Sequence, residues 1–443
     1  MYTALCSHIL FPLHERLKGH TSVALRRELE RTQWLDAPAL QALQIERLKK
    51  FVVNVAQHVP YYRDQMNART IQTIDDLRQL PLLTKEMIRA NTERLKSTTA
   101  RKLIRYNTGG SSGEPLVFFM GPDRVSHDVA AKWRATRWWG VDIGDPEIVL
   151  WGSPVELGKQ DRIKAIRDRL LRSYLLPAFS MSEEQMRKYL TEIVHIKPRM
   201  LFGYASALAL LASFSEAERI DMRSCGVKVA FATGETLYPD QRAVIERVFN
   251  TKVANGYGSR DAGFIAHQCP QGSLHQSVEH ILVELLGVDG RPVPVGQTGE
   301  IVTTHMATSD FPFIRYRTGD MAVASDAPCA CGRGLPVFKE VHGRSTDFVR
   351  TASGNVMHAL ALIYEVRDKP GVRAFKFIQA EDLSVELLLV AGAELTDALE
   401  KSIHLGLEKR MGPGTVPAIR RVPEIPPEKS GKYRYVVSRA GRK

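Results

Sequence analysis

A short loop combines three glycines with three hydroxyl side chains: Thr108, Gly109, Gly110, Ser111, Ser112 and Gly113. Glycines allow successive backbone N–H groups to point toward one centre, and hydroxyls add further donors, so this composition suits phosphate oxygens. The loop is not a Walker A motif, because Glu114 follows it, and it lacks the G-x-G-x-x-G spacing of dinucleotide-binding loops. The same residues also favour a polar turn between two strands, so the loop by itself leaves both interpretations open.

A second group of residues has the chemistry of a metal site. Cys269 precedes His275 by six positions, and Cys329 and Cys331 form a Cys-x-Cys-Gly segment about sixty residues further on. Three thiolates and one imidazole are a ligand set typical of structural Zn²⁺. One ion bound by both pairs would join the two ends of the segment between them. Two alternatives remain: His267 replaces one ligand, or the four residues are unrelated loop residues in a reducing compartment.

These residues need a large scaffold, and the chain provides one. It has 443 residues, 44% of them hydrophobic and 25% charged, as in a soluble globular protein of about two to three domains. Hydrophobic spacing predicts helices over 20–66 and 123–139, and Thr84 is the expected N-cap of another helix. Short apolar runs predict the strands of a parallel sheet with crossover helices; they lie at 147–151, 200–203, 227–232 and 251–256.

The pattern changes twice toward the C-terminus. Strand-like runs joined by tight turns predict a β-rich subdomain over about 277–340. A boundary is expected near residue 343, so that 1–343 form a large domain and 344–443 a small α+β domain. The predicted fold class is therefore α/β: a large N-terminal domain of mixed sheets, helices and a β-rich subdomain, followed by a small C-terminal domain.

Five further segments accompany the glycine-rich loop in a definite order. They are 232–237 (Ala-Thr-Gly-Glu-Thr-Leu), 255–261 (Asn-Gly-Tyr-Gly-Ser-Arg-Asp), 315–320 (Arg-Tyr-Arg-Thr-Gly-Asp), 343–347 (Gly-Arg-Ser-Thr-Asp) and 428–434 (Glu-Lys-Ser-Gly-Lys-Tyr-Arg). Their order and rough spacing resemble the AMP-forming acyl-CoA synthetase superfamily of adenylate-forming enzymes. Within it, the chain is similar to the phenylacetate–CoA ligase family and its CapK-like branch of polysaccharide-cluster homologues. The resemblance extends over nearly the whole chain.

The resemblance implies ATP-dependent activation of a carboxylic acid to an acyl-adenylate, followed by transfer to coenzyme A. It implies ATP, Mg²⁺ and coenzyme A as cofactors, with the loop at 108–113 holding the β- and γ-phosphates. The remaining expected nucleotide-binding residues are Gly234, Glu235, Thr236, Asn255, Tyr257, Gly258, Ser259 and Asp320. Tyr257 would pack against adenine and Asp320 would accept the ribose hydroxyls. Asp261 stands where the family usually carries a glutamate that orients Mg²⁺.

By the same resemblance, the C-terminal domain is mobile and carries the catalytic lysine. Lys432 corresponds to the lysine that contacts the α-phosphate and the carboxylate, with Lys429 as the nearest competitor. Arg344 would contact ribose or phosphate. The family's hinge aspartate falls two residues after this arginine, where the chain has Thr346, and Asp347 takes the next place.

The residues that would bind the carboxylic acid are the hardest part of the site to predict from the sequence. The resemblance places Tyr204, Ala205 and Ala232 along it, where they would shape a flat slot of the size of an aryl group. Packing between a strand and a helix explains the same residues equally well. The acid therefore stays open among aryl, short acyl and larger polar carboxylates.

The net charge of +12 is spread along the chain and includes no dense basic tract interleaved with aromatic residues. It suits a polyanionic small molecule better than nucleic acid, and a solvated basic surface explains it as simply. Neither a membrane-spanning run nor a secretory signal is recognisable, so we expect no integral membrane segment and a cytoplasmic location. The oligomeric state is left open between a monomer and a homodimer.

Two other functions remain compatible with these residues. One is adenylation without thioester formation, in which the activated group passes to a sugar, an amine or a carrier protein in polysaccharide or capsule biosynthesis. In a variant of it, AMP stays on the acceptor, as in the related coenzyme F390 synthetases. The other belongs to a different class: a non-catalytic module that keeps the fold and binds the nucleotide.

Overall fold

The computed structural model describes residues 1–66, 71–108, 116–151, 162–178, 181–344, 348–350, 356–358, 360–367, 369–412, 417–426 and 434–439. Contacts within the chain divide it into two compact units, Met1–His342 and Gly343–Lys443. The boundary expected after residue 343 lies one residue from this division. Each unit is described below by itself.

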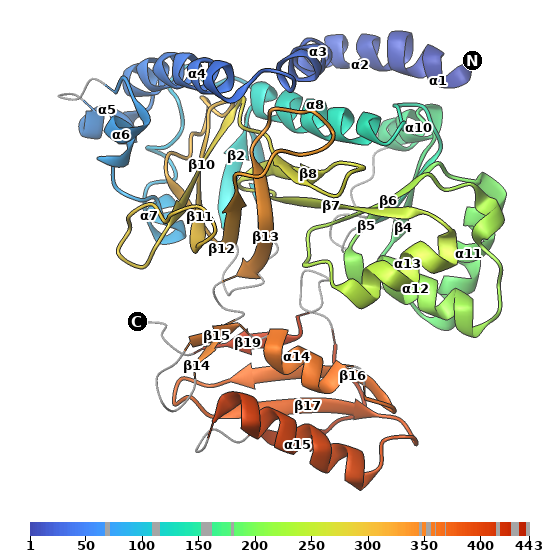
Figure 1. The fold of residues 1–443 in the computed structure, drawn as a ribbon. Helices are drawn as coiled ribbons and strands as arrows, with labels where there is room; N and C mark the ends of the chain where they lie inside the picture. Colours follow the sequence, from blue (N-terminus) through green and yellow to red (C-terminus); the bar gives the residue numbers. More distant parts are fainter. Residues whose placement is uncertain are drawn as a thin grey trace. The chain divides into compact units, whose positions relative to one another are not determined.

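A large mixed sheet forms the centre of the first unit (Figure 1). In the described part of the chain it has 11 strands in the order β10-β11-β12-β13-β9-β8-β7-β6-β5-β3-β4. Their bounds are β3 Glu147–Trp151, β4 Ser173–Pro177, β5 Met200–Gly203, β6 Val229–Thr233, β7 Lys252–Ser259, β8 Gly263–Gln268, β9 Leu274–Gln276, β10 Ile281–Leu286, β11 Thr298–His305, β12 Tyr316–Ser325 and β13 Val337–Arg344.

The sheet has a parallel half and an antiparallel half. The two halves belong to one continuous sheet. The strands β3, β5, β6 and β7 are parallel, as their apolar runs predict, and β4, which was not predicted, pairs with β3 in the same direction. The strands of 277–340 are paired antiparallel where their ladders are described, yet they do not form a sheet of their own. The short strand β9 pairs with both β8 and β13 and so joins them to the parallel half.

Helices cover both faces of the parallel half, because its strands alternate apolar residues toward each face. On β5, Leu201 packs in one core cluster with the helices α11 (Glu183–Ile196), α12 (Ala205–Ala217) and α13 (Pro239–Phe249). Its neighbour Phe202 packs in another, with Ala135 of the helix α8 (Pro122–Trp138). The helix predicted over 123–139 is thus confirmed as a cover of the second face.

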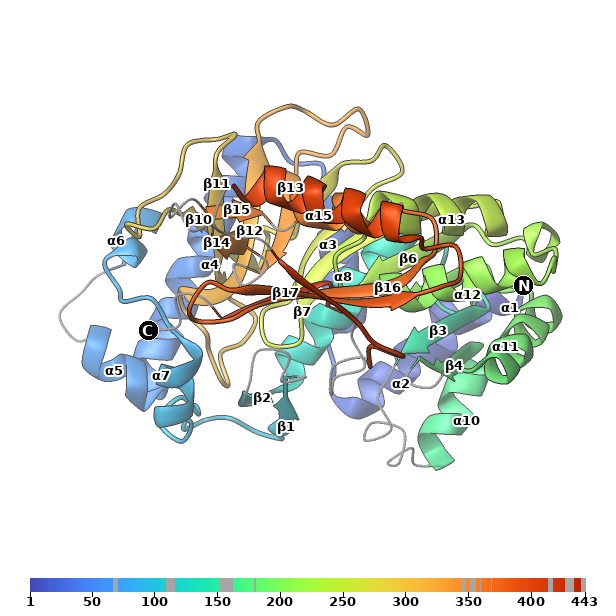
Figure 2. The ribbon, with the colours of Figure 1, turned by 90° about the horizontal axis from the view of Figure 1, so that it is seen from below.

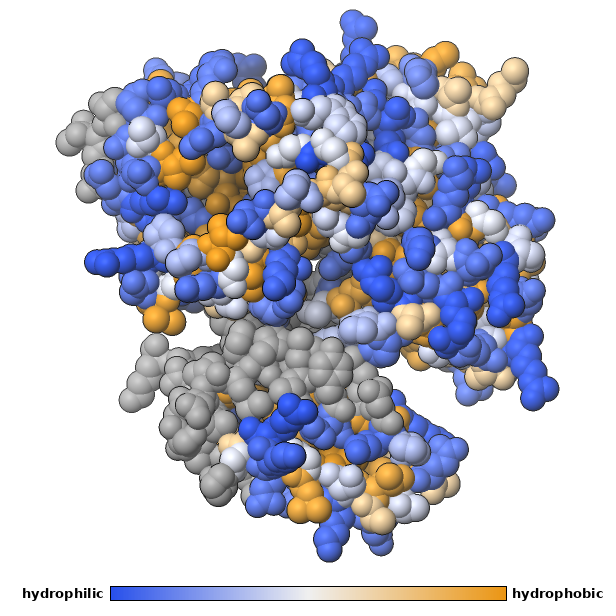
Figure 3. Space-filling model, in the orientation of Figure 1, coloured by the Kyte–Doolittle hydropathy of each residue, from blue (hydrophilic) through white to orange (hydrophobic). Residues whose placement is uncertain are grey.

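The antiparallel half packs against one long helix and three short helices from the N-terminal part of the chain. These are α4 (Ala37–His58), α5 (Pro60–Met66), α6 (Ile74–Arg78) and α7 (Lys85–Ala90), which contribute to the largest core cluster. Figure 3 shows hydrophobic residues gathered where α4 to α6 flank β10 and β11. The hydroxyl of Thr84 accepts from the N–H of Met87, so the predicted N-cap is confirmed. Pro60 begins α5, which suits a proline at a first helical position.

A row of helices lies along one edge of the first unit, at the top of Figure 1, and the same helices pass behind the sheet in the view of Figure 2. It consists of α1 (Tyr2–Leu5), the π-helical turn η1 (Cys6–Leu10), α2 (Phe11–Lys18), α3 (Ser22–Thr32) and α4. The elements α3, α4 and α5 account for the helical region predicted over 20–66. Further elements of this unit are the hairpin β1 (Ile104–Asn107) and β2 (Val117–Met120), the helix α10 (Arg162–Leu170) and the 3-10 turn η2 (Arg223–Cys225).

The second unit is a small α+β domain. Its described strands β16 (Val372–Gln379), β17 (Val385–Ala391), β18 (Ala418–Arg421) and β19 (Val436–Ser438) form a sheet in the order β18-β17-β16-β19. Two helices, α14 (Leu360–Arg367) and α15 (Asp397–Met411), and the hairpin of β14 (Phe348–Arg350) and β15 (Val356–His358) complete it. In the described residues of both units, no helix is long and apolar enough to cross a membrane.

Candidate active site

Two predicted site residues, Tyr204 and Gly234, lie at the carboxyl ends of adjacent parallel strands, where α/β sheets usually bind ligands. Tyr204 follows β5 and stacks on Trp151 at the end of β3, with ring centroids 4.2 Å apart. Gly234 follows β6 with a φ of 79°, and a Cβ there would lie 3.2 Å from both rings. Glycine is therefore favoured at this position by its backbone conformation and by the close approach of the two aromatic rings.

Glu235 fixes the loop that begins at Gly234. Its Oε2 accepts a hydrogen bond of 3.0 Å from the N–H of Ser206, in the first turn of α12. A carboxylate is favourable at a helix N-terminus, where the backbone N–H groups lack helical partners. The loop of 234–236 is thereby held against Tyr204.

The two residues predicted for adenine and ribose are in direct contact. The hydroxyl of Tyr257, on β7, donates to Asp320 Oδ2, on β12, over 2.8 Å. These strands are not neighbours in the sheet. Burial, followed by the negative charge of Asp320, raises the pKa of Tyr257 well above its usual value. Tyr257 therefore stays a neutral hydrogen-bond donor at physiological pH, and Asp320 is oriented by it.

Asp261 lies in a buried network beside this pair. The hydroxyl of Tyr316, itself fully buried, donates to Asp261 Oδ2 over 2.5 Å. Burial alone would raise the pKa of Asp261, but the positive charge of Lys85 and hydrogen bonds from Ser259 and Tyr316 outweigh it and lower the pKa. Asp261 is therefore ionised at neutral pH, as a Mg²⁺ ligand must be.

The loop that carries Asp261 is held from behind by Arg124 of α8. Its guanidinium donates to the carbonyls of Arg260 and Asp261 over 3.1 and 3.3 Å. A Cβ on Gly258 would lie 2.3 Å from the carbonyl oxygen of Gly263, so the turn closes only with glycine there. Sequence reasoning missed Arg124, Lys85 and Tyr316, although Tyr316 lies within the segment at 315–320.

Of the residues predicted for the phosphates, the hinge and the catalytic lysine, only Thr108 has a described side chain. Thr108 exchanges backbone and side-chain hydrogen bonds of 2.9 and 3.0 Å with Leu116, which closes the base of the glycine-rich loop at the end of the β1–β2 hairpin. The residues 109–113, Thr346, Asp347 and Lys432 lie outside the described residues, as does the side chain of Arg344 at the end of β13.

The remaining predicted residues take ordinary structural places. The N–H of Asn255 donates to Gln268 Oε1 over 3.0 Å, and the hydroxyl of Ser259 accepts from the N–H of Ala262 over 3.1 Å. Thr236 is half-buried. Ala205 and Ala232 are fully buried in the core between the sheet and its helices, and their place in an acid pocket stays a prediction.

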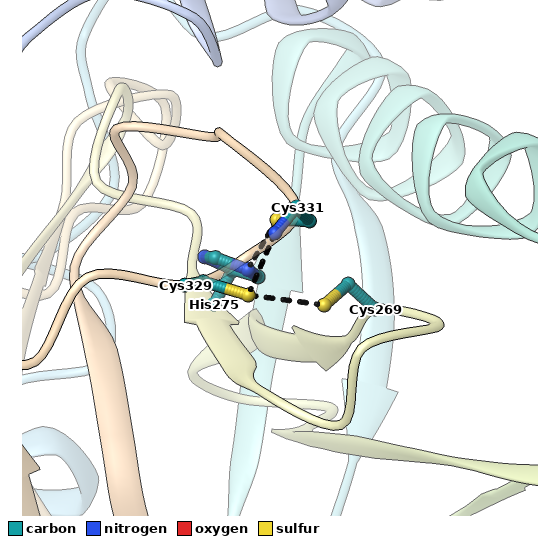
Figure 4. A group of neighbouring side chains, drawn as sticks. All are labelled: Cys269, His275, Cys329 and Cys331. Atoms are coloured by element: carbon teal, nitrogen blue, oxygen red, sulfur yellow. Dashed lines mark hydrogen bonds between the residues drawn. The ribbon is translucent and has the colours of Figure 1, made fainter.

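The four predicted metal ligands converge around β9, the strand that carries His275. Figure 4 shows Cys269, His275, Cys329 and Cys331 facing one another, and one ligand atom from each lies within 4.8 Å of the others. The sulfurs of Cys269 and Cys329 are 3.6 Å apart, and Cys331 Sγ lies 3.2 Å from His275 Nε2. The rival ligand His267 is not part of this group and stacks on Phe264.

The donor set fits a tetrahedral zinc ion. Two sulfurs bound to one Zn²⁺ at about 2.3 Å each would lie roughly 3.8 Å apart, close to the observed separation. His275 Nδ1 lies 3.1 Å from the carbonyl oxygen of Leu335, which orients the ring and leaves Nε2 toward the sulfurs. Burial raises the pKa of the Cys269 thiol to about 12, so a metal ion is needed to hold it as a thiolate.

The geometry can be compared with known proteins. Residues 349–439 match the family model of the CapK C-terminal domain. The chain is 23% identical over 405 residues to the protein CapK of Staphylococcus aureus, covering 89% of this chain and 88% of that protein. It is 25% identical over 334 residues to a phenylacetate-coenzyme A ligase of Aromatoleum evansii, covering 73% and 74% of the two chains. CapK and the phenylacetate–CoA ligases are its homologues. The resemblance found in the sequence is thereby confirmed.

Solved structures place the fold in the same group. A 2-hydroxyisobutyryl-CoA ligase in its postadenylation state superposes with a TM-score of 0.76 at 19% identity, over 92% of this chain and 91% of that one. An anthranilate CoA ligase matches with a TM-score of 0.55 at 15% identity, over 79% and 68% of the two chains. At these identities the likeness shows the fold alone, and the predicted fold class is confirmed.

Proposed function

We propose that this protein is an AMP-forming ligase that converts a carboxylic acid to an acyl-adenylate and then transfers the acyl group to a thiol, coenzyme A. The contact between Tyr257 and Asp320 carries the proposal, because it brings together two separate motifs that were expected to bind the adenine and the ribose. The adjacent ionised Asp261 and the similarity to phenylacetate–CoA ligases support it.

The side chains suit the first half-reaction. Asp320, oriented by Tyr257, would accept the ribose hydroxyls, since a fixed carboxylate can accept from both. Asp261 would hold Mg²⁺, which when bound neutralises charge on the phosphates. The hydrogen bond from Tyr316 keeps one carboxylate oxygen of Asp261 in a single orientation. The loop at 108–113 would bind the phosphates, and Lys432 and Arg344 would add positive charge at the α-phosphate.

Pyrophosphate exchange with a panel of aryl, short acyl and polar carboxylic acids tests this half-reaction. We expect at least one acid to stimulate exchange. Lys432→Ala should reduce it about 100-fold or more, as expected when a charge that stabilises the transition state is removed. Lys429→Ala is the matched control and should exchange normally. Failure of every acid in the panel, or failure of the protein to bind ATP, would favour a non-catalytic nucleotide-binding module.

The acceptor of the second half-reaction has a second candidate. The similarity to CapK extends over 89% of the chain, whereas that to the phenylacetate–CoA ligase extends over 73%, and the C-terminal domain matches the CapK model. This favours considering a sugar, an amine or a carrier as acceptor, or AMP left on the acceptor. Coenzyme A should accelerate AMP release if it is the acceptor. Release that is unchanged by coenzyme A would favour a CapK-like acceptor instead.

We also propose that Cys269, His275, Cys329 and Cys331, called here the Cys/His cluster, bind one structural Zn²⁺. The ion would tie the turn after β8 to the segment before β13, and so brace the junction between the two halves of the sheet. The separations between the ligand atoms support this assignment. Its test is given with the predictions below.

A further inference from the structure

The row of N-terminal helices exposes an aliphatic stripe. Four residues spaced four apart, Leu5, Ile9, Leu13 and Leu17, are exposed to 41, 57, 54 and 80%. They lie on α1, η1 and α2, which follow one another without a break. The other side of the same helices buries residues such as Phe11. A helix that covers the protein with one apolar side and exposes a second is unusual for a solvent-facing surface.

The apolar surface continues onto α10. The hydroxyl of Tyr2 donates to the carbonyl oxygen of Leu170 over 2.7 Å, which places the end of α10 beside the start of the stripe. Ile166 and Leu170 on α10 are themselves more than half exposed. Six exposed aliphatic side chains, four on the continuous run of α1, η1 and α2 and two on α10, are more than the scattered apolar residues of an ordinary surface.

The charges around the stripe are of one sign. Residues 1–35 are all described, and their exposed charged side chains are the cations Arg16, Lys18, Arg27 and Arg31. None of their acidic residues is exposed: Glu15, Glu28 and Glu30 are buried or half-buried and bonded to histidine or arginine. Within residues 1–35 the four cations are therefore exposed and the three carboxylates are paired, and the nearest exposed acid along the chain is Asp36.

The exposed aliphatic side chains and the exposed cations together indicate which kind of partner fits this surface. A second copy docked through this face would bring the four exposed cations of residues 1–35 of each chain together, with no exposed acid from the same residues to compensate them, so self-association is opposed by like charges. An anionic lipid surface provides both a region for the aliphatic side chains and negative headgroups for the arginines. We propose that residues 1–34, together with the end of α10, form a surface by which this protein docks reversibly on anionic membranes. Trp34, more than half exposed, suits the headgroup region.

The test is co-sedimentation of the full-length protein with vesicles. We expect binding to vesicles of equal parts phosphatidylglycerol and phosphatidylcholine, with little binding to phosphatidylcholine alone and a loss of binding as salt is raised. The variant Ile9→Ser with Leu13→Ser should bind at least about tenfold more weakly, since two aliphatic side chains no longer enter the acyl boundary. The variant Arg27→Glu with Arg31→Glu should also bind these vesicles at least about tenfold more weakly, because two cations that attract the anionic headgroups are replaced by carboxylates.

Matched controls use exposed residues of the same unit outside this surface. Val288→Ser and Arg291→Glu change an exposed aliphatic and an exposed cation on the turn after β10, and should bind vesicles like the unchanged protein. Thermal unfolding of all variants checks that the fold is retained. The proposal is overturned if anionic and neutral vesicles bind equally, or if both N-terminal variants bind normally. It is also overturned if no vesicle binds and Ile9→Ser with Leu13→Ser converts a dimer to a monomer in sedimentation, which would assign the stripe to a second copy.

Discussion

The Cys/His cluster and a second group of side chains both bring possible metal ligands within 4.8 Å of one another, but their surroundings differ. The second group, called here the histidine cluster, consists of His127, Asp128 and His305, with His280 beside it. The ring of His127 meets those of His280 and His305 edge-on, with centroids 5.0 and 4.7 Å apart. Both groups are largely enclosed by protein.

The histidine cluster is already neutral without a metal. Both oxygens of Asp128 accept from Arg124 Nε, over 3.1 and 3.0 Å, so its charge is compensated. Burial lowers the pKa of His127 and takes those of His280 and His305 well below the usual value, which keeps the rings uncharged. A divalent cation here would add charge that nothing balances.

The Cys/His cluster, in contrast, requires a positive charge to compensate its ligands when they are ionised. Its three thiols become thiolates when they bind a metal, and a divalent cation is then the charge that compensates them. Closeness of ligand atoms is therefore not enough for a metal site. The charge that the ligands carry, and the partner that already neutralises it, decide between a metal centre and a buried polar core.

The largest effect is expected from Cys329→Ser combined with Cys331→Ser. Losing two of four ligands should abolish zinc binding and lower the free energy of unfolding by about 4 kcal/mol, the stabilisation given by a ligand present at a thousand times its dissociation constant. Metal content by mass spectrometry and urea unfolding measure the two effects. Cys225→Ala, at a buried cysteine outside the cluster, should keep its zinc. Equal metal content in both variants and the unchanged protein would contradict the assignment.

An effect of similar size, without loss of the metal, is expected at the buried ion pair of Arg134 and Glu279. Their side chains are 1 and 0% exposed and 2.5 Å apart. Glu279→Gln would leave a buried guanidinium without its counter-charge, at a cost of about 3–5 kcal/mol in urea unfolding. Burial is the main cause that lowers the pKa of His275 and of His280, and the positive charge of Arg134 lowers both further, so the change should affect both clusters. Glu93→Gln, in an exposed pair with Lys96, should cost less than about 1 kcal/mol.

The histidine cluster should make the protein sensitive to acid. Its histidines bind protons less readily when folded than when unfolded, so the unfolded state gains protons first as the pH falls below about 6.5. Stability from each is present above that pH and falls by up to about 1.4 kcal/mol per pH unit below it. In urea unfolding measured between about pH 7 and pH 5, His127→Phe should make the free energy of unfolding fall less steeply, by the contribution of one histidine. The neighbouring Asp128, Arg124 and Glu279 are retained, so an unchanged slope would show that His127 is not protected from protonation.

The smallest effect is expected from His305→Asn, which alters the histidine cluster alone. Zinc content should stay at one equivalent per chain, and cobalt substituted for zinc should keep the absorption band of cobalt–thiolate bonds. A second equivalent of metal in the unchanged protein, lost in this variant, would break the comparison. It would show that the ion pair of Asp128 with Arg124 does not prevent metal binding.

Much of the fold was predictable from local patterns. The strands of the parallel half follow apolar runs, the N-cap at Thr84 follows its hydroxyl, and the four ligands of the Cys/His cluster could be found because cysteines are few and lie in turns. The continuity of the sheet was not predictable. It depends on β9, a three-residue strand that pairs on both sides, and three residues carry too little pattern to reveal a pairing.

The candidate site divides in the same way. Residue types are readable from the sequence: a glycine-rich loop, and Tyr257, Asp261 and Asp320 in separate motifs. The contacts between them come from the folded chain, in which Tyr257 orients Asp320, and Lys85 and Tyr316 keep Asp261 ionised. The reason is physical, because hydrogen bonds and burial depend on distances between residues far apart in the chain, whereas residue type and spacing describe only what each segment can offer.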